Sequence, residues 1–204
     1  MTMDTNINTA WDELRQKVKD CRKCGLCEKR HNTVFGDGPT ENCRVVLVGE
    51  GPGADEDATG LPFVGKAGML LTSILEQGGN IPRKSLYITN IVKCRPPENR
   101  NPKIEEAEAC SEFLETQLIL LHPDIVVTLG NVPTQFLLNT KQGITSLRGQ
   151  WIPWRGILLL PMFHPSYLLR NESRAKGSPK DLTWQDVRAL KAKIDELTQG
   201  GSIS

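Results

Sequence analysis

The chain has 204 residues and a formal net charge of +1, with 38% hydrophobic and 24% charged residues. A chain of this length is expected to fold as one domain around a sizeable core that needs no disulfides. The composition disfavours a disordered chain, and no apolar run approaches the roughly 20 residues that a membrane helix requires. Met1–Asn6 lack the basic and apolar parts of a secretory signal, so we expect a reducing, cytoplasmic environment for the thiols.

Charge is distributed unevenly along the chain. Arg15–Arg30 holds seven basic and two acidic residues, whereas Ile104–Asp124 holds six acidic and no basic residues. Lys93–Lys103 and His164–Lys180 each carry a net charge of +3. The basic segments could together form a face that binds phosphates, although solvated surface segments of this size are more common.

A first helix is predicted from Thr9 to Lys19, and a basic, cysteine-containing loop follows it, so that the two occupy residues 9–43. Four short runs of aliphatic and β-branched residues come next. They predict strands that are buried on both faces of a parallel sheet. These runs are Arg44–Val48, Ser85–Val92, Asp124–Leu129 and Ile157–Phe163.

Segments with helical spacing separate the predicted strands. One ends at Gly78, and a longer one is predicted to start with Asn101 as its N-cap and Pro102 at its first helical position. Because strands and helices alternate, residues 44–170 are predicted to form the core of an α/β fold. We expect a three-layer α/β/α architecture with a central four-stranded parallel sheet.

The C-terminal part is predicted to be a polar loop, Asn171–Lys180, and an amphipathic helix that follows Asp181. This loop and helix cover residues 171–198, and residues 199–204 resemble a frayed tail. Residues 1–204 are therefore expected to form a single domain.

A glycine-rich turn, Gly49–Gly53, follows the first predicted strand, at the sheet edge where open α/β folds place their sites. With Ala54 it satisfies a dinucleotide-binding fingerprint, but Asp55, Glu56 and Asp57 come next and would repel a pyrophosphate. A glycine turn followed by acidic residues is more typical of a site with a catalytic base or a water-positioning group than of a phosphate-binding loop. A tight turn with solvated acids is the alternative.

The six cysteines are Cys21, Cys24, Cys27, Cys43, Cys94 and Cys110. Local pairs of cysteines in a cytoplasmic chain favour a metal or cluster site over disulfides, with scattered structural thiols as the alternative. Four thiolates satisfy either zinc or a [4Fe–4S] cluster, and the spacing does not choose between them. Cys27 extends the first pair to C-x2-C-x2-C, whereas Cys43 opens a strand and is expected to be buried as a small hydrophobe.

Four segments carry further motifs, namely GEGPG at Gly49–Gly53, TGLPFVG at Thr59–Gly65, ITNIVKCRPP at Ile88–Pro97 and HPSYLLR at His164–Arg170. In this order and spacing, and together with the cysteine pairs, they resemble the family 4 uracil-DNA glycosylases, the iron–sulfur branch of that superfamily. The resemblance extends from Cys21 to Arg170. One such motif would be weak evidence, but four in register are highly specific.

The resemblance implies a monofunctional hydrolase that flips uracil out of single- or double-stranded DNA and cleaves its N-glycosidic bond. The products are free uracil and an abasic site, as in base excision repair. It implies a [4Fe–4S] cluster held by Cys21, Cys24, Cys94 and Cys110, with zinc as the less favoured occupant. We further expect a monomer that is associated with the nucleoid and not with a membrane.

Three residues match the catalytic positions of the family. The amide of Asn90 can accept a hydrogen bond from uracil N3–H and donate one to O4, which distinguishes uracil from cytosine. His164 can donate to O2, where negative charge develops as the base departs. Glu50 resembles the carboxylate that activates water and stabilises the sugar cation.

The base pocket is implied to include Gly49, Gly51 and Phe63, with Phe63 as a stacking platform for the base. Glu56 and Asp57 match the acidic stretch of the family. They could share the water-activating role and leave Glu50 to position its loop, which we consider the weaker alternative.

Leu168, Leu169 and Arg170 follow the histidine, and an apolar wedge beside a basic residue suits insertion into the minor groove. We expect Leu168 to be the tip of this wedge and Arg95 to contact phosphate together with Arg170. The alternative is that the two leucines begin a buried helix.

Other functions remain open from sequence alone. One alternative is a DNA-binding or electron-transfer module in which the cluster is the functional group, but such a module would not need the amide, the imidazole and the carboxylate. A second alternative is a dinucleotide-binding enzyme, and the acidic residues after the glycine turn argue against it. A related branch traps DNA through a histidine in the loop after the Asn90 motif. Arg95–Pro102 holds no histidine, which argues against that branch.

Overall fold

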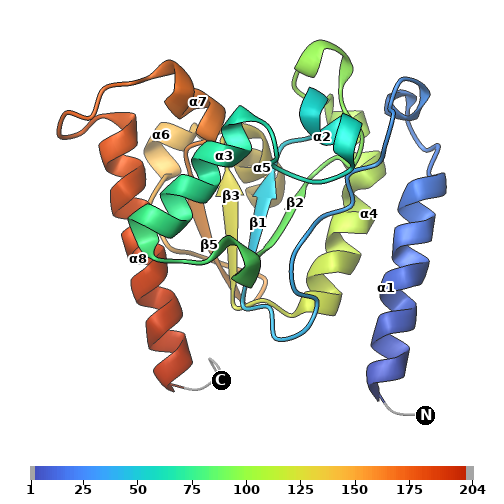
Figure 1. Ribbon diagram of the computed structural model, residues 1–204, viewed down its shortest axis with the longest axis horizontal. Helices are drawn as coiled ribbons and strands as arrows, with labels where there is room; N and C mark the ends of the chain where they lie inside the picture. The colour runs from blue at the N-terminus through green and yellow to red at the C-terminus, as the bar shows by residue number, and fades with distance from the viewer. Residues whose placement is uncertain (1–2, 201–204) are drawn as a thin grey trace.

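The computed structural model describes residues 3–200 (Figure 1). Most of the predicted tail, residues 201–204, and the first two residues of the segment considered for a signal lie outside this range. Within it, no helix has the length and apolarity needed to cross a lipid bilayer.

A five-stranded sheet forms the centre of the described residues, in the order β2-β1-β3-β5-β4. The strands are β1 (Val45–Gly49), β2 (Tyr87–Asn90), β3 (Ile125–Leu129), β4 (Ile152–Trp154) and β5 (Ile157–Met162). The pairs β1–β2, β1–β3 and β3–β5 are parallel, so all four predicted strands and their parallel arrangement are confirmed.

The fifth strand, β4, corrects the prediction of a four-stranded sheet. It pairs antiparallel with β5 at the sheet edge. Its three residues include Pro153, which cannot donate a ladder hydrogen bond and is tolerated in sheets chiefly at an edge. A run this short, interrupted by proline, gives no strand pattern in the sequence.

Helices and short helical turns connect and cover these strands (Figure 1). The longer helices are α1 (Met3–Asp20), α3 (Lys66–Ser73), α4 (Ile104–Leu121), α5 (Asn131–Leu138) and α8 (Pro179–Gly200). The shorter ones are η1 (Gly25–Glu28), α2 (Ala54–Thr59), the π-helical turn η2 (Ile74–Gly78), η3 (Arg83–Ser85), η4 (Pro97–Asn99), α6 (Ile144–Leu147) and α7 (Pro165–Arg170).

The long helix α4 begins at Ile104, so the prediction of Asn101 as its N-cap is wrong. The carboxylate of Glu106 determines the start, because it accepts a hydrogen bond from the backbone N–H of Lys103 at 2.8 Å. Arg100 also binds this carboxylate, at 2.7 and 2.8 Å. The residues around Pro102 therefore form an extended segment that leads into the helix.

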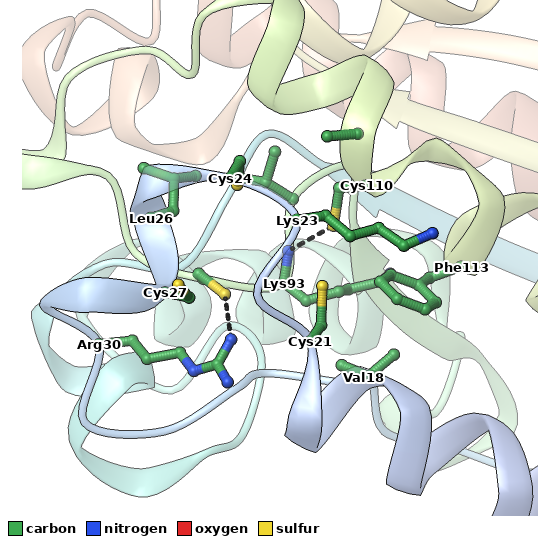
Figure 2. A pocket seen from close by; sticks show the side chains of 13 residues that line it. Val18, Cys21, Lys23, Cys24, Leu26, Cys27, Arg30, Lys93, Cys110 and Phe113 are labelled. Atoms are coloured by element: carbon green, nitrogen blue, oxygen red, sulfur yellow. Dashed lines mark hydrogen bonds between the residues drawn. The ribbon is translucent and has the colours of Figure 1, made fainter.

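One face of the sheet packs against α1 and α4, which lie side by side (Figure 1). Val46 and Val48 of β1 point into this layer, as the alternation of a strand requires. The loop that contains η1 lies next to α4 and carries the first three cysteines. Figure 2 shows Cys110 of α4 close to this loop.

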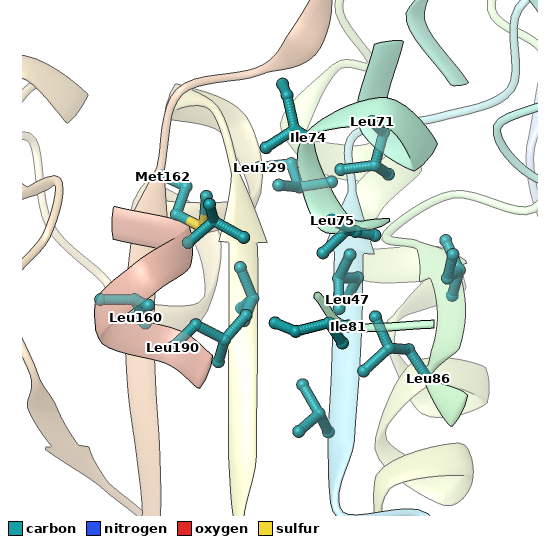
Figure 3. Close-up of a cluster of buried hydrophobic side chains, with 14 of the residues drawn as sticks. Leu47, Leu71, Ile74, Leu75, Ile81, Leu86, Leu129, Leu160, Met162 and Leu190 are labelled. Carbon is teal, nitrogen blue, oxygen red and sulfur yellow. The ribbon is translucent and has the colours of Figure 1, made fainter. Parts of the chain in front are cut away.

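The opposite face packs against α3, η2 and α8 and forms the larger apolar core (Figure 3). Val45 and Leu47 of β1 belong to this core together with Leu190 of α8. Gly78 at the end of η2 has no room for a side chain, because a Cβ there would collide with the ring of Trp184. Helical layers on both faces confirm the predicted α/β/α architecture.

Candidate active site and cysteine cavity

A cavity of about 610 Å³ opens at the carboxyl ends of the parallel strands. Glu50 directly follows β1, Asn90 ends β2 and His164 follows β5, and all three line this cavity. The sheet therefore brings together three residues that are separated by up to 114 positions in the sequence. A volume of this size is typical of small-molecule pockets.

Asn90 lies at the floor of the cavity and is only 1% exposed. Its Oδ1 is buried and has no hydrogen-bond partner among the described residues. Leaving such an atom unpaired costs about 1–3 kcal/mol, so its retention points to a ligand that donates to it. Lys93 fixes the backbone below, because its ammonium donates to the Asn90 carbonyl at 2.8 Å. Burial lowers the pKa of Lys93 to about 8.

Phe63 forms one wall of the cavity next to His164, with 5.8 Å between the ring centroids. The absence of a side chain at Gly49 makes this arrangement possible. A Cβ at Gly49 would lie 2.6 Å from the Phe63 ring and would also collide with Asn90 Oδ1. Gly51 lines the same cavity. Gly49 does not line it among the described residues, and instead leaves room for Phe63 and Asn90.

His164 caps α7, and the protonation of its ring follows from its contacts. Its Nδ1 accepts a hydrogen bond from the backbone N–H of Ser166 at 3.1 Å and lies 2.8 Å from Ser166 Oγ. Burial lowers the pKa of His164 to about 4, with Arg170 acting in the same direction and Glu56 opposing it. The neutral ring therefore carries its proton on Nε2 at pH 7.

Glu50 and Glu56 both line the cavity, but their carboxylates differ in their hydrogen-bond contacts. Burial raises the pKa of Glu50, and its carboxylate has no hydrogen-bond partner among the described residues. Glu56 accepts from the N–H groups of Val64 and Gly65 at 2.9 Å each, and from Gly53 N–H at 3.1 Å. Glu56 thus joins two loops, whereas Glu50 is available to a water.

Asp57 does not lie in the cavity, so the suggestion that it shares the water is wrong. Its carboxylate is buried and faces the N-terminal loop, where it binds His31 Nδ1 at 2.6 Å and His31 N–H at 3.0 Å. The reason is helical geometry, because adjacent residues of α2 point in different directions. Asp57 instead ties the cysteine loop to the core.

The prediction of Leu168 as the exposed wedge tip is also wrong. Leu168 is 1% exposed and belongs to the core under α7, while Leu169 is 41% exposed. The alternative, that these residues start a buried helix, holds for Leu168 alone. Tyr167 and Arg170 line the cavity from the same short helix. Arg95 lies outside the cavity, and its Nε donates to Asn99 Oδ1 at 2.8 Å.

Sequence reasoning missed the residues after β3. Gly130 and Asn131 line the cavity, and the same argument from strand ends that found Glu50 and Asn90 could have found them. Gly130 has φ +96° and lets the chain pass close to the Cβ of His164.

A second cavity, between the N-terminal loop and α4, is lined by Cys21, Cys24, Cys27, Cys94 and Cys110 (Figure 2). All six cysteines are free thiols. Cys43 lies elsewhere, 2% exposed, with its Sγ 3.3 Å from Val45 O, as expected for a buried structural thiol. The structure therefore confirms that the four cysteines predicted as ligands lie around one cavity, and Cys27 lines it as well.

Positive groups surround these sulfurs. Arg30 donates to Cys94 Sγ at 3.2 Å, and the backbone N–H of Lys93 donates to Cys110 Sγ at 3.4 Å. Burial raises the pKa of the Cys110 thiol to about 11, against the opposing effect of Lys93. Within residues 3–200, no three cysteine, histidine, aspartate or glutamate side chains lie close enough to hold a single metal ion.

A cavity of about 610 Å³ lies at the carboxyl ends of the parallel strands, and a carboxylate, an amide and a neutral imidazole line it. This arrangement is typical of an α/β protein of the DNA glycosylase type. The family model described as the uracil DNA glycosylase superfamily matches residues 35–188. The chain belongs to this superfamily.

Characterised relatives refine the comparison. The type-4 uracil-DNA glycosylase of Thermotoga maritima is 50% identical over 181 residues, which cover 88% of this chain and 92% of that protein. The type-4 uracil-DNA glycosylase of Sulfurisphaera tokodaii is 38% identical over 188 residues, or 88% and 84% of the two chains. A type-5 uracil-DNA glycosylase of Pyrobaculum aerophilum is 31% identical over 149 residues, or 65% and 66%.

Proposed function

We propose that the chain is a monofunctional uracil-DNA glycosylase that hydrolyses the bond between uracil and deoxyribose in DNA. The observation that carries this proposal is the buried, unpartnered Oδ1 of Asn90 at the floor of the cavity. It requires a donor, and uracil N3–H supplies one. Cytosine presents an acceptor at N3 and would leave the atom unpaired. The names and identity of the type-4 relatives support the same activity.

The cavity walls explain how the flipped base is held. Phe63 presents its ring for stacking, and the Asn90 amide reads the edge of the base through N3–H and O4. Gly49 keeps the floor open for both side chains. An extruded base thus finds shape and hydrogen bonds that compensate for its lost stacking in DNA.

His164 and Glu50 act on the charges that develop during cleavage. The Nε2–H of neutral His164 donates to O2 of the departing uracil, which accumulates negative charge. The Glu50 carboxylate orients or deprotonates the attacking water and stabilises the oxocarbenium-like sugar. Glu56 keeps the Glu50 loop and the Phe63 loop in register and does not act on the water itself.

The surface beside the cavity provides the DNA contacts. Leu169 is exposed on α7, and Tyr167 and Arg170 border the cavity on the same helix. An apolar side chain next to a cation suits a wedge that fills the gap left by the flipped base. We therefore assign the wedge to Leu169, with Arg170 and Arg95 as phosphate contacts.

The cysteine cavity suits a [4Fe–4S] cluster held by Cys21, Cys24, Cys94 and Cys110. The four cysteines line one cavity, and N–H groups donate to two of their sulfurs, as is common around cluster sulfurs. When bound, the cluster would supply cross-links between the N-terminal loop, the Asn90 segment and α4, without a redox step.

The proposed function is tested by incubating the purified protein with DNA that holds one uracil, thymine or cytosine at the same position. We expect release of free uracil and an alkali-labile abasic site from the first substrate only. An electron-transfer or DNA-binding module would instead leave all three substrates intact, and that outcome would overturn the proposal. Single- and double-stranded forms of each substrate measure the strand preference.

Substitution of the cysteines separates cluster ligands from structural thiols. We expect Cys94→Ala to abolish iron binding and to destabilise the fold, because Cys94 joins the N-terminal loop to the Asn90 segment. Cys43→Ala is the matched control, a buried thiol outside the cavity, and should keep about four irons per chain. The measurement is the iron and zinc content of protein purified without air. Equal iron in both variants, or zinc in the wild type, would contradict the assignment.

A further inference from the structure

The backbone of Phe63 adopts an unusual conformation. Its φ is +52°, in the left-handed region that aromatic residues rarely enter. The side chain is 7% exposed and forms a wall of the base cavity. Such strained backbones persist only where the surrounding contacts over-determine them, and they gather at functional sites. The contacts that hold Phe63 are therefore informative.

Arg83 supplies the largest set of these contacts from a distant segment, the turn η3. Its Nη2 donates to Pro62 O at 2.7 Å and its Nη1 donates to Phe63 O at 3.0 Å. Nη1 also donates to Thr72 Oγ1 on α3 at 3.0 Å, and this contact fixes the orientation of the guanidinium group. The planar guanidinium thus binds two successive carbonyls on either side of the strained φ angle.

Glu56 completes the restraint from the opposite side. Its carboxylate accepts from the N–H groups of Val64 and Gly65, the two residues that follow Phe63. The Arg83 cation therefore binds the carbonyls of Pro62 and Phe63, and the Glu56 anion binds the N–H groups of the next two residues. Gly68 of α3 allows the helix to approach closely, because a Cβ there would collide with the Phe63 carbonyl.

We propose that Arg83 is a positioning residue that locks Phe63 in the orientation required for stacking on the flipped base. This inference rests on the proposed function for its catalytic consequence. Arg83 does not line the base cavity. It borders a separate hollow of about 340 Å³ that also contains Asp37 and Glu76. Lys84 lines this hollow too, so two acidic residues balance its two cations and no net positive charge faces DNA phosphates. Arg83 therefore acts through the backbone carbonyls that it binds.

The first experiment needs no catalysis and measures backbone hydrogen exchange by nuclear magnetic resonance. We expect Arg83→Gln to accelerate exchange at Val64 and Gly65 by at least about tenfold relative to the rest of the chain. Lys84→Gln is the matched control, since it removes an exposed cation from the adjacent position. Unchanged exchange at Val64 and Gly65 in the Arg83→Gln variant would overturn the proposal, whatever the protein does to DNA.

The second experiment measures kcat/KM for uracil excision in a double-mutant cycle. Arg83→Gln should lower it about 10- to 100-fold, Arg83→Lys by less, and Lys84→Gln not at all. In a Phe63→Ala background the Arg83→Gln change should have no further effect on excision, because the ring that Arg83 orients through the backbone is then absent. Additive losses would overturn the role through Phe63. Absence of excision by the wild type would overturn the proposed function alone, with the exchange experiment still deciding the role of Arg83.

Discussion

Replacing Asn90 by aspartate is expected to abolish most uracil excision while the protein stays folded. The change conserves shape and keeps an acceptor for uracil N3–H, but it replaces the amide donor that faces O4 with a second oxygen. A whole bidentate pair contributes about 1–3 kcal/mol, of which this change removes the donor half. The added negative charge also opposes the charge that builds on the departing base. We expect kcat/KM to fall by at least about 100-fold.

The comparison variant for this prediction is Asn90→Ala, which removes both contacts without adding charge. It should also lose most activity, and its melting temperature should stay close to that of the wild type, because Oδ1 has no internal partner to lose. Excision rates and circular dichroism melts of the three proteins test this together. An aspartate variant as active as the wild type would show that Asn90 does not read the base.

Replacing His164 by alanine is expected to lower kcat by about 100- to 1,000-fold, the usual consequence of removing one donor to a developing anion. The effect should fall on kcat more than on KM, since the charge on O2 appears only as the bond breaks. Nδ1 is occupied by the Ser166 N–H, so Nε2 is the sole nitrogen of the ring available for this contact.

Two variants and a pH profile complete the test of His164. Ser166→Ala removes the hydroxyl near Nδ1 but keeps the backbone N–H, so it should lose far less activity than His164→Ala. With the pKa of His164 at about 4, protonation of its ring should not change the wild-type rate near pH 6.5. The rate should decline only as the pH falls through the raised pKa of Glu50, because protonation removes the base. A rate that follows the protonation of a histidine near pH 6.5 would contradict the neutral donor.

The sequence contains enough information to predict the edge of the sheet where the site lies. Each parallel strand is rich in buried apolar residues. A chemically distinctive residue stands at or after the end of three of them, as with Glu50, Asn90 and His164. Parallel strands end at one edge, so the convergence of these residues follows from topology alone. The structure confirms both the strands and the convergence.

The wrong predictions concern residues whose orientation depends on how a short helix is rotated about its axis. The sequence of a short segment does not determine that rotation. Leu168 and Leu169 are equally apolar neighbours, and only the packing of α7 on α3 decides which one is buried. Glu56 and Asp57 differ in the same way, because one turns toward the cavity and the other toward His31. Arg83 lies outside every motif, and its contacts are with backbone carbonyls that carry no sequence signature.

The central claim is that a carboxylate, an amide and an imidazole surround one extruded uracil. A crystal structure of the protein soaked with free uracil tests it most directly. We predict uracil in the cavity of about 610 Å³, with its ring against Phe63, N3–H on Asn90 Oδ1 and O2 at His164 Nε2. Uracil bound away from these three side chains, or a cavity that stays empty at saturating uracil, would contradict the account.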